Sequence, residues 1–170
     1  MLAGATGTRF VSKTEVRSHW LLGWLADQND TLYIERQDRR GVLDQADKVA
    51  RALTDQRPLA LFPEGTTGDG RTLLPFRSAL LAAVTPLPAG CSVRPVAIDY
   101  GAMRTAMGWT HGESGTTNAL RLLGRRGGFP VMVRLLDELP ASANRKALAQ
   151  ETQAAIASAL AASNANAADL

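Results

Sequence analysis

The sequence has one cysteine and only two histidines in 170 residues, and this scarcity excludes several kinds of site. Cys91 has no partner for an internal disulfide. It precedes an apolar run with no histidine near it in sequence, so we expect a small half-buried side chain and not a catalytic thiol. His19 and His111 are too few and too far apart for zinc-like spacing. The sequence therefore predicts no metal site.

Long apolar runs are also absent. No window approaches the roughly 18 consecutive apolar residues that span a bilayer. The N-terminus lacks the basic and then apolar layout of a signal peptide. Peripheral contact is therefore the membrane hypothesis that the printed sequence leaves open.

The excess of positive charge is small, with a formal net charge of +3, but sixteen of the nineteen basic residues are arginine. Arginine offers planar, bidentate donors to phosphate and carboxylate groups. Genomic base composition produces the same preference, so composition alone leaves both explanations open. The arginines are scattered and no aromatic and basic recognition motif accompanies them, so we expect no nucleic-acid partner.

What is present is an apolar content of 45%, enough for the core of one domain, with short apolar runs that alternate with amphipathic ones. Strands are expected at 9–11, 31–34, 58–62, 93–98 and 131–136, the last three of them buried. Helices are expected at 15–26, 44–53, 78–84 and 142–161. The alternation predicts an α/β domain with a mainly parallel central sheet flanked by helices, over residues 1–162, with residues 163–170 as a flexible tail.

The loop after the run 58–62 carries the strongest chemical signal. It reads Pro-Glu-Gly-Thr-Thr-Gly-Asp-Gly-Arg over residues 63–71 and should lie at the carboxyl end of a strand, where ligands of open α/β sheets bind. Its glycines permit close backbone approach, and its amides and threonine hydroxyls suit a phosphate or an ester. A glycine-rich turn with a solvated Glu64 is the alternative. The closing Gly-Lys-Ser/Thr of a nucleotide P-loop is absent.

Four segments in a fixed order resemble the glycerolipid acyltransferases related to 1-acylglycerol-3-phosphate acyltransferase. They are Phe-Val-Ser-Lys-Thr-Glu-Val at 10–16 with Gly-Trp-Leu at 23–25, Thr-Leu-Tyr-Ile-Glu-Arg at 31–36, Phe-Pro-Glu-Gly-Thr-Thr at 62–67, and Val-Arg-Pro-Val-Ala-Ile at 93–98. Residues 109–139, with Glu113, Gly115 and Arg-Leu-Leu at 121–123, are similar to the tail of bacterial members. The resemblance implies a fold like that of glycerol-3-phosphate acyltransferase.

The activity implied by this resemblance is acyl transfer from acyl-CoA or acyl-carrier protein to 1-acylglycerol-3-phosphate in phospholipid synthesis, with no cofactor. The acceptor could equally be another lyso-lipid, such as an ornithine lipid precursor. The resemblance also implies a lysophospholipid acceptor as partner and a peripheral location at the cytoplasmic face of the membrane.

The family's general base is a His followed five positions later by an Asp, but His19 is followed at that spacing by Trp24 and His111 by Thr116. No catalytic residue is therefore assigned. We expect an N-terminally truncated enzyme whose sequence starts just after that block; the alternative is a natural lipid-binding or phosphate-binding pseudoenzyme domain.

The remaining site residues follow from the resemblance. Arg36 is expected to hold the acceptor phosphate, with Glu64, Gly65 and Thr66 shaping the same pocket and Arg71 adding a phosphate contact. Arg39 and Arg40 could contribute as well, or could be the solvated entry of a helix. Pro95 is expected to shape an acyl-side wall.

A Trp-bearing apolar face on residues 15–26 admits two interpretations. Trp20 and Trp24, with three leucines between and beside them, could dip into a membrane interface. A helix packed on the sheet needs the same pattern, and this is the simpler interpretation.

Overall fold

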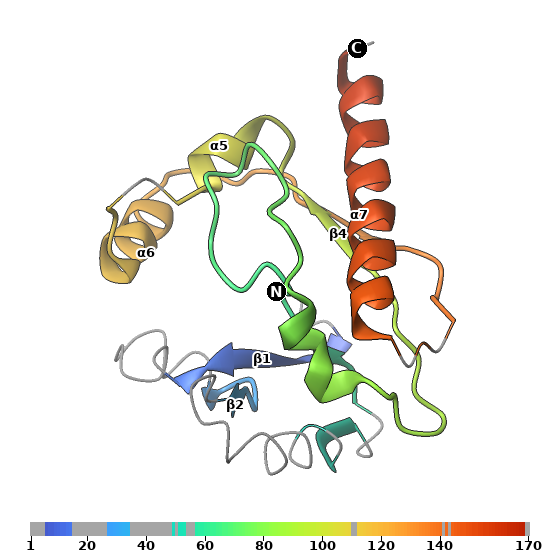
Figure 1. Cartoon of the computed structure of the whole chain (residues 1–170). Coiled ribbons are helices and arrows are strands. Elements are labelled where there is room, and N and C mark those ends of the chain that lie inside the picture. Colours follow the sequence, from blue (N-terminus) through green and yellow to red (C-terminus); the bar gives the residue numbers. More distant parts are fainter. Residues whose placement is uncertain are drawn as a thin grey trace.

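A parallel sheet organises the N-terminal half of the chain. The computed structural model describes residues 6–14, 27–34, 49, 51–53, 57–109, 112–140, 142 and 144–168. Strand β1 (Arg9–Lys13) lies between β2 (Leu32–Ile34) and β3 (Leu59–Ala60) and runs parallel to both (Figure 1). Val11 pairs with Leu32 on one side, and Phe10 pairs with Ala60 on the other. The mainly parallel sheet predicted from the alternation is confirmed.

The two remaining strands form a separate antiparallel pair. β4 (Val96–Asp99) pairs with β5 (Met132–Leu135), and an isolated bridge joins Val93 to Leu139. The expectation of a buried strand at 131–136 was wrong. Three of the four side chains of β5 are exposed, because the strand has β4 as its one partner and its apolar residues have no covering layer among the described residues.

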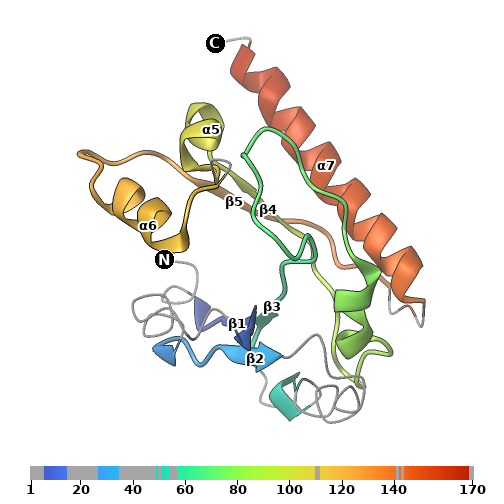
Figure 2. The same cartoon turned by 60° about the vertical axis from the view of Figure 1, so that its left-hand side comes forward.

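Some helices pack against this strand pair, and others follow β4 in the chain. The 3-10 helix η1 (Ser78–Val84) and α7 (Arg145–Ala168) pack together, and α7 also packs on β4. After β4 come η2 (Gly101–Met103), α5 (Arg104–Met107) and α6 (Gly115–Leu123). The β4–β5 pair lies between α6 and α7 (Figure 2). Helix α7 runs to Ala168, past the predicted end at 161, while the flexibility of residues 163–170 stays a prediction.

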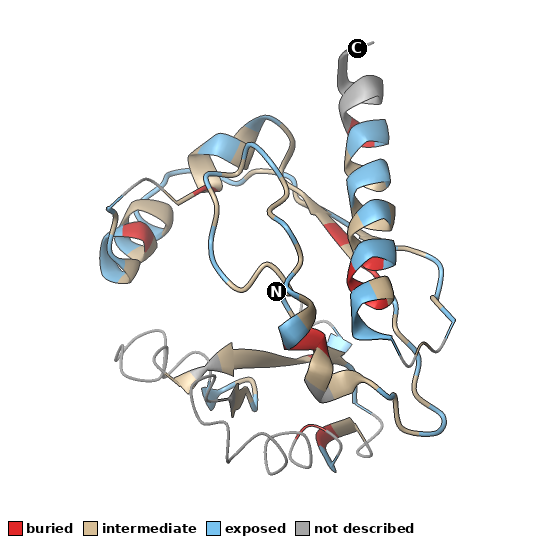
Figure 3. Ribbon diagram, in the orientation of Figure 1, coloured by how far each residue is buried: buried red, intermediate tan, exposed pale blue. Residues whose placement is uncertain are grey.

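The core lies where η1 meets the first turns of α7 (Figure 3). Leu81, Leu148 and Ala149 are buried together, and five partly buried apolar residues pack around them: Leu61, Phe76, Val84, Val93 and Leu139. The backbone amide of Phe76 donates to Oε1 of Gln153 on α7 at 3.0 Å. This core therefore ties the segment after β3 to the C-terminal helix.

Replacing Leu148 with alanine should destabilise the protein by about 2–5 kcal/mol, because the side chain is 0% exposed and its loss leaves a cavity among packed apolar groups. Urea denaturation measures the free energy of unfolding. Leu120→Ala is the matched control, since Leu120 is 68% exposed and its truncation should change stability by less than about 0.5 kcal/mol. Equal midpoints for the two variants would contradict this account of the core.

Two predicted helices fall mainly or wholly outside the described residues. The range 15–26, with Trp20 and Trp24, lies entirely outside them, as do Arg39 and Arg40. Of 44–53, Val49 and residues 51–53 are helical, and Val49 is buried at 1% exposure. That part of the amphipathic prediction is confirmed, and its apolar face points inward as the spacing required.

Candidate active site: an acceptor pocket at the strand ends

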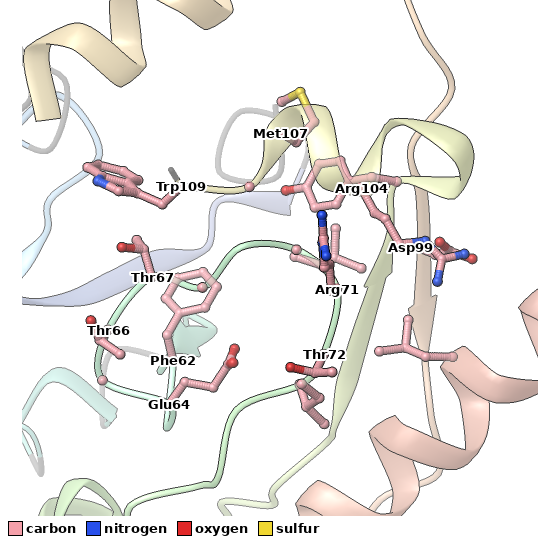
Figure 4. Close-up of a pocket in the computed structure, with 18 of the residues that line it drawn as sticks. Phe62, Glu64, Thr66, Thr67, Arg71, Thr72, Asp99, Arg104, Met107 and Trp109 are labelled. Carbon is pink, nitrogen blue, oxygen red and sulfur yellow. The ribbon is translucent and has the colours of Figure 1, made fainter. Parts of the chain in front are cut away.

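A cavity of about 960 Å³ opens at the carboxyl ends of β3 and β4. Its walls come from the end of β1, the loop 61–73, the segment 98–109 after β4, and the inner sides of α6 and α7. Several of its lining residues are labelled in Figure 4. The apolar part of the lining includes Val11, Leu61, Phe62, Leu73, Ile98, Met107, Leu122, Ala157, Leu160 and Ala161. One cavity thus presents a polar loop beside an apolar wall, as an amphiphilic ligand requires.

The loop after β3 is held in shape by its own side chains. Oε2 of Glu64 accepts a hydrogen bond from the backbone amide of Leu74 at 2.8 Å, which closes the loop across its base. Gly65 and Gly70 have φ of +70° and +77°, angles that favour glycine. Oδ1 of Asp69 accepts from the amide of Arg71 at 2.9 Å. The loop is therefore a defined turn, and Glu64 is a structural brace as well as a wall of the cavity.

A second segment, residues 104–109, packs closely against this loop through backbone atoms. The amide of Trp109 donates to the carbonyl of Gly68 at 2.8 Å. A Cβ on Gly70 would overlap the carbonyl oxygen of Arg104, and a Cβ on Gly108 would overlap the carbonyl oxygen of Asp69. Both positions therefore need glycine, because no larger residue allows the two segments to approach so closely.

Arg121 on α6 holds this second segment from behind. Its guanidinium donates to the carbonyl oxygens of Ala106 at 2.5 Å and Gly108 at 2.8 Å. It also pairs with the carboxylate of Glu113 at 2.8 Å, and the Glu113 side chain is only 5% exposed. Hydrogen bonding to Glu113 raises the pKa of Arg121. The wall of the cavity at 106–109 is thus fixed by an ion pair, with the indole N–H of Trp109 donating to the carbonyl of Glu113 at 2.8 Å.

Four of the five predicted site residues line this cavity: Glu64, Gly65, Thr66 and Arg71. Figure 4 shows Glu64, Thr66 and Arg71 as sticks on the same loop. The fifth, Arg36, lies outside the described residues. Pro95 is buried immediately before β4 and is not among the lining residues of this cavity, so its role in an acyl-side wall stays a prediction.

Asp99, Arg104 and Trp109 are among the polar lining residues that were not predicted from the sequence. Asp99 ends β4, and its Oδ1 accepts from the amide of Gly101 at 2.8 Å. An acidic residue at the carboxyl end of a strand was a usable signal, because two strand ends meet at one edge of the molecule. The cavity therefore carries a second carboxylate besides the predicted Glu64, together with the arginines.

Metal and membrane signals are absent from the described part of the chain. Within these residues no three His, Cys, Asp or Glu side chains gather as a metal site would require. No helix among them is both long and apolar enough to cross a membrane. Cys91, half-buried as predicted, lies outside the cavity lining.

The chain is thus an α/β domain with a braced glycine-rich loop beside a cavity that has both apolar and charged walls. The sequence profile of the Acyltransferase family matches residues 2–99, and the chain belongs to that family. It is 38% identical over 168 residues to the lyso-ornithine lipid O-acyltransferase of Pseudomonas aeruginosa. This alignment covers 94% of this chain and 62% of that protein. The Brucella abortus protein of the same name is 31% identical, covering 88% and 62%.

A third relative carries a different substrate in its name. The 1-acyl-sn-glycerol-3-phosphate acyltransferase of Neisseria gonorrhoeae is 33% identical over 91 residues, or 54% of this chain and 35% of that protein. The chain spans about three fifths of the length of the lyso-ornithine lipid relatives from Pseudomonas and Brucella. No solved structure matches it.

Proposed function

We propose that this chain is the acceptor-binding body of an O-acyltransferase of lipid biosynthesis, and that its acceptor is a lyso-ornithine lipid. The acyl donor is acyl-CoA or acyl-carrier protein, no cofactor takes part, and the reaction takes place at the cytoplasmic face of the membrane. The observation that carries the proposal is the cavity that combines an apolar wall with both Asp99 and Arg71. The wide coverage of this chain by lyso-ornithine lipid acyltransferases supports the same choice.

The head groups of the two candidate acceptors differ in charge. An ornithine head group carries an ammonium and a carboxylate, whereas lysophosphatidate presents a phosphate alone. Arg71 pairs loosely with Asp69, at 3.9 Å between Nε and Oδ2, but its side chain is 72% exposed and can also bind the carboxylate of the acceptor. Asp99 can bind the ammonium. A phosphate would gain from Arg71 but would be repelled by Asp99. The mixed charge of the cavity therefore favours the zwitterionic acceptor.

Chemistry at this site needs a base that removes the acceptor hydroxyl's proton as that oxygen attacks the thioester carbonyl. The family's His-x4-Asp pair has no counterpart in the printed sequence. We therefore expect the chain to bind acceptor without turnover, and a fusion that places the family's His-x4-Asp block ahead of Met1 to transfer the acyl group. Thioester consumption that depends on lyso-lipid separates these forms. A fusion that binds acceptor but consumes no thioester would favour the non-catalytic pseudoenzyme.

Asp99→Asn should weaken binding of a short-chain, soluble lyso-ornithine lipid by about tenfold, the value of one charge-assisted contact. The amide oxygen of asparagine can still accept from Gly101, so the turn after β4 is preserved. Isothermal titration calorimetry measures the affinity, with short-chain lysophosphatidate as the second ligand and the exposed Asp137→Asn as the control variant. Lysophosphatidate that binds more tightly than the ornithine lipid to the parent chain would overturn the assignment of the acceptor.

A further inference from the structure

Helix α6 has one face that packs against the protein and one face that is exposed. Its inner face is fixed: Asn118 is 5% exposed, Arg121 reaches the carbonyl groups of 106 and 108, and Leu122 lines the cavity. At about 100° per residue, position 120 points away from both 118 and 122. Leu120 and Leu123 are accordingly 68% and 71% exposed. These are large apolar side chains that the fold holds outward.

The rotation of α6 about its axis is well determined. Ser114 caps its first turn by accepting from the amide of Thr117 at 3.1 Å, and Arg121 anchors its last turn. A turn of the helix that buried Leu120 would break the bonds of Arg121 and expose the Glu113 carboxylate. The outward leucines are therefore a consequence of the same contacts that build the cavity wall.

Positive charge follows directly after the exposed leucines. Arg125 and Arg126 are exposed, and neither forms an ion pair with another residue in the described part of the chain. Glu113, the one acidic residue between 112 and 128, is already paired with Arg121. Apolar side chains next to unopposed arginines are complementary to the interface of an anionic bilayer, with its acyl chains below and its phosphates above.

Figures 1 and 3 show α6 at an edge of the molecule, on the opposite side from α7, with much of its surface exposed. A helix is about 10 Å thick with its side chains, so α6 alone separates its outward leucines from the cavity. We propose that the outer face of α6, formed by Leu120, Leu123, Arg125 and Arg126, docks on an anionic lipid surface. The docked helix would hold the cavity about one helix thickness from the bilayer, where an acceptor lipid is available. This purpose rests on the proposed function, whereas the docking itself does not.

Flotation of the chain with vesicles tests the docking. Vesicles of phosphatidylcholine with phosphatidylglycerol should bind the chain, and those of phosphatidylcholine alone should bind it less. Leu120→Ser with Leu123→Ser should reduce binding at least tenfold, and Arg125→Gln with Arg126→Gln should reduce it about fivefold for each charge removed. Raised salt should mimic the arginine variant. Met132→Ser with Leu135→Ser, an apolar pair on β5 that is also more than half exposed, should leave binding unchanged.

A polarity-sensitive fluorescent dye provides a second measurement. It is attached to the cysteine of a Leu123→Cys variant that also carries Cys91→Ser. Its emission should shift to the blue when anionic vesicles are added. Failure of the parent chain to bind vesicles, or equal losses from the β5 pair, would overturn the proposal. So would loss of binding only when Trp20 and Trp24 are replaced. Acceptor affinity for the soluble short-chain lipid should not change in the Leu120 and Leu123 variant, so failure of docking and failure of the proposed function remain distinguishable.

Discussion

Replacing Gly108 with alanine is expected to destabilise the protein by about 3 kcal/mol or more, beyond the usual cost of overpacking. Gly108 is buried, and an added Cβ would overlap the carbonyl group of Asp69 on the facing loop. Backbone cannot move aside as the end of a flexible side chain can. Its φ of −62° is ordinary for any residue, so the whole effect comes from the overlap. Urea denaturation of the parent and variant chains measures the loss.

Gly70 and Gly90 complete this comparison. Alanine at Gly70 meets both penalties, a φ of +77° and overlap with the carbonyl oxygen of Arg104. Alanine at Gly90 meets only the first, because its φ is +81° but nothing lies within 4 Å of the added carbon. Gly90→Ala should therefore cost about 1–2 kcal/mol, and Gly70→Ala should cost clearly more. If all three variants unfold at the same urea concentration, the close approach of the two segments is wrong.

The loss should extend beyond stability in the variants that still fold. The overlap would drive the loop 65–70 away from the segment 104–109, and these two segments form facing walls of one cavity. Acceptor binding should therefore weaken in Gly108→Ala and stay at the parent level in Gly90→Ala. Calorimetry at a temperature where both variants are folded makes this comparison, with circular dichroism as the check on folding.

Much of the fold could be predicted from the sequence because its strongest signals are local. The runs around Phe10, Tyr33 and Leu59 are strands, and they pair in parallel as the alternation with helical segments required. The antiparallel β4–β5 pair was not predictable in this way, since strand direction depends on the path of the connection. The exposure of β5 was missed because an apolar run shows what could be buried and not what is available to cover it.

The same distinction between local and long-range signals applies to the residues of the site. Glu64, Gly65, Thr66 and Arg71 are adjacent in sequence, and one loop motif was enough to find them. Asp99 and Trp109 join them only through tertiary contacts. The resemblance to the tail of bacterial acyltransferases included Glu113 and Arg121, but sequence could not show that they bond to each other and to the wall of the cavity. Such long-range pairs become visible only in three dimensions.

Arg121→Ala is expected to reduce acceptor binding by on the order of tenfold to hundredfold, although Arg121 is not among the residues that line the cavity. The variant releases the carbonyl groups of Ala106 and Gly108 together, and it leaves the nearly buried Glu113 carboxylate without its cation. Lysine should restore little, because one ammonium cannot reproduce the planar fork that reaches two carbonyl groups and a carboxylate. Calorimetry with the soluble acceptor measures the affinity, and Arg125→Ala is the control.

A positioning role and a purely electrostatic one predict different behaviour in the double variant Arg121→Ala with Glu113→Gln. Neutralising Glu113 removes the unpaired buried charge, so thermal stability should partly return. Acceptor affinity should remain low, because no side chain then holds 106–108 against α6. Trp109 reports this movement directly in a chain with Trp20→Phe and Trp24→Phe: its emission should shift in both Arg121 variants, as the indole loses its fixed bond to the carbonyl of Glu113. Recovery of affinity together with stability would show that Arg121 serves only to neutralise Glu113. The wall of the cavity would then be held by the close approach of Gly70 and Gly108 and by the hydrogen bond from Trp109 to Gly68.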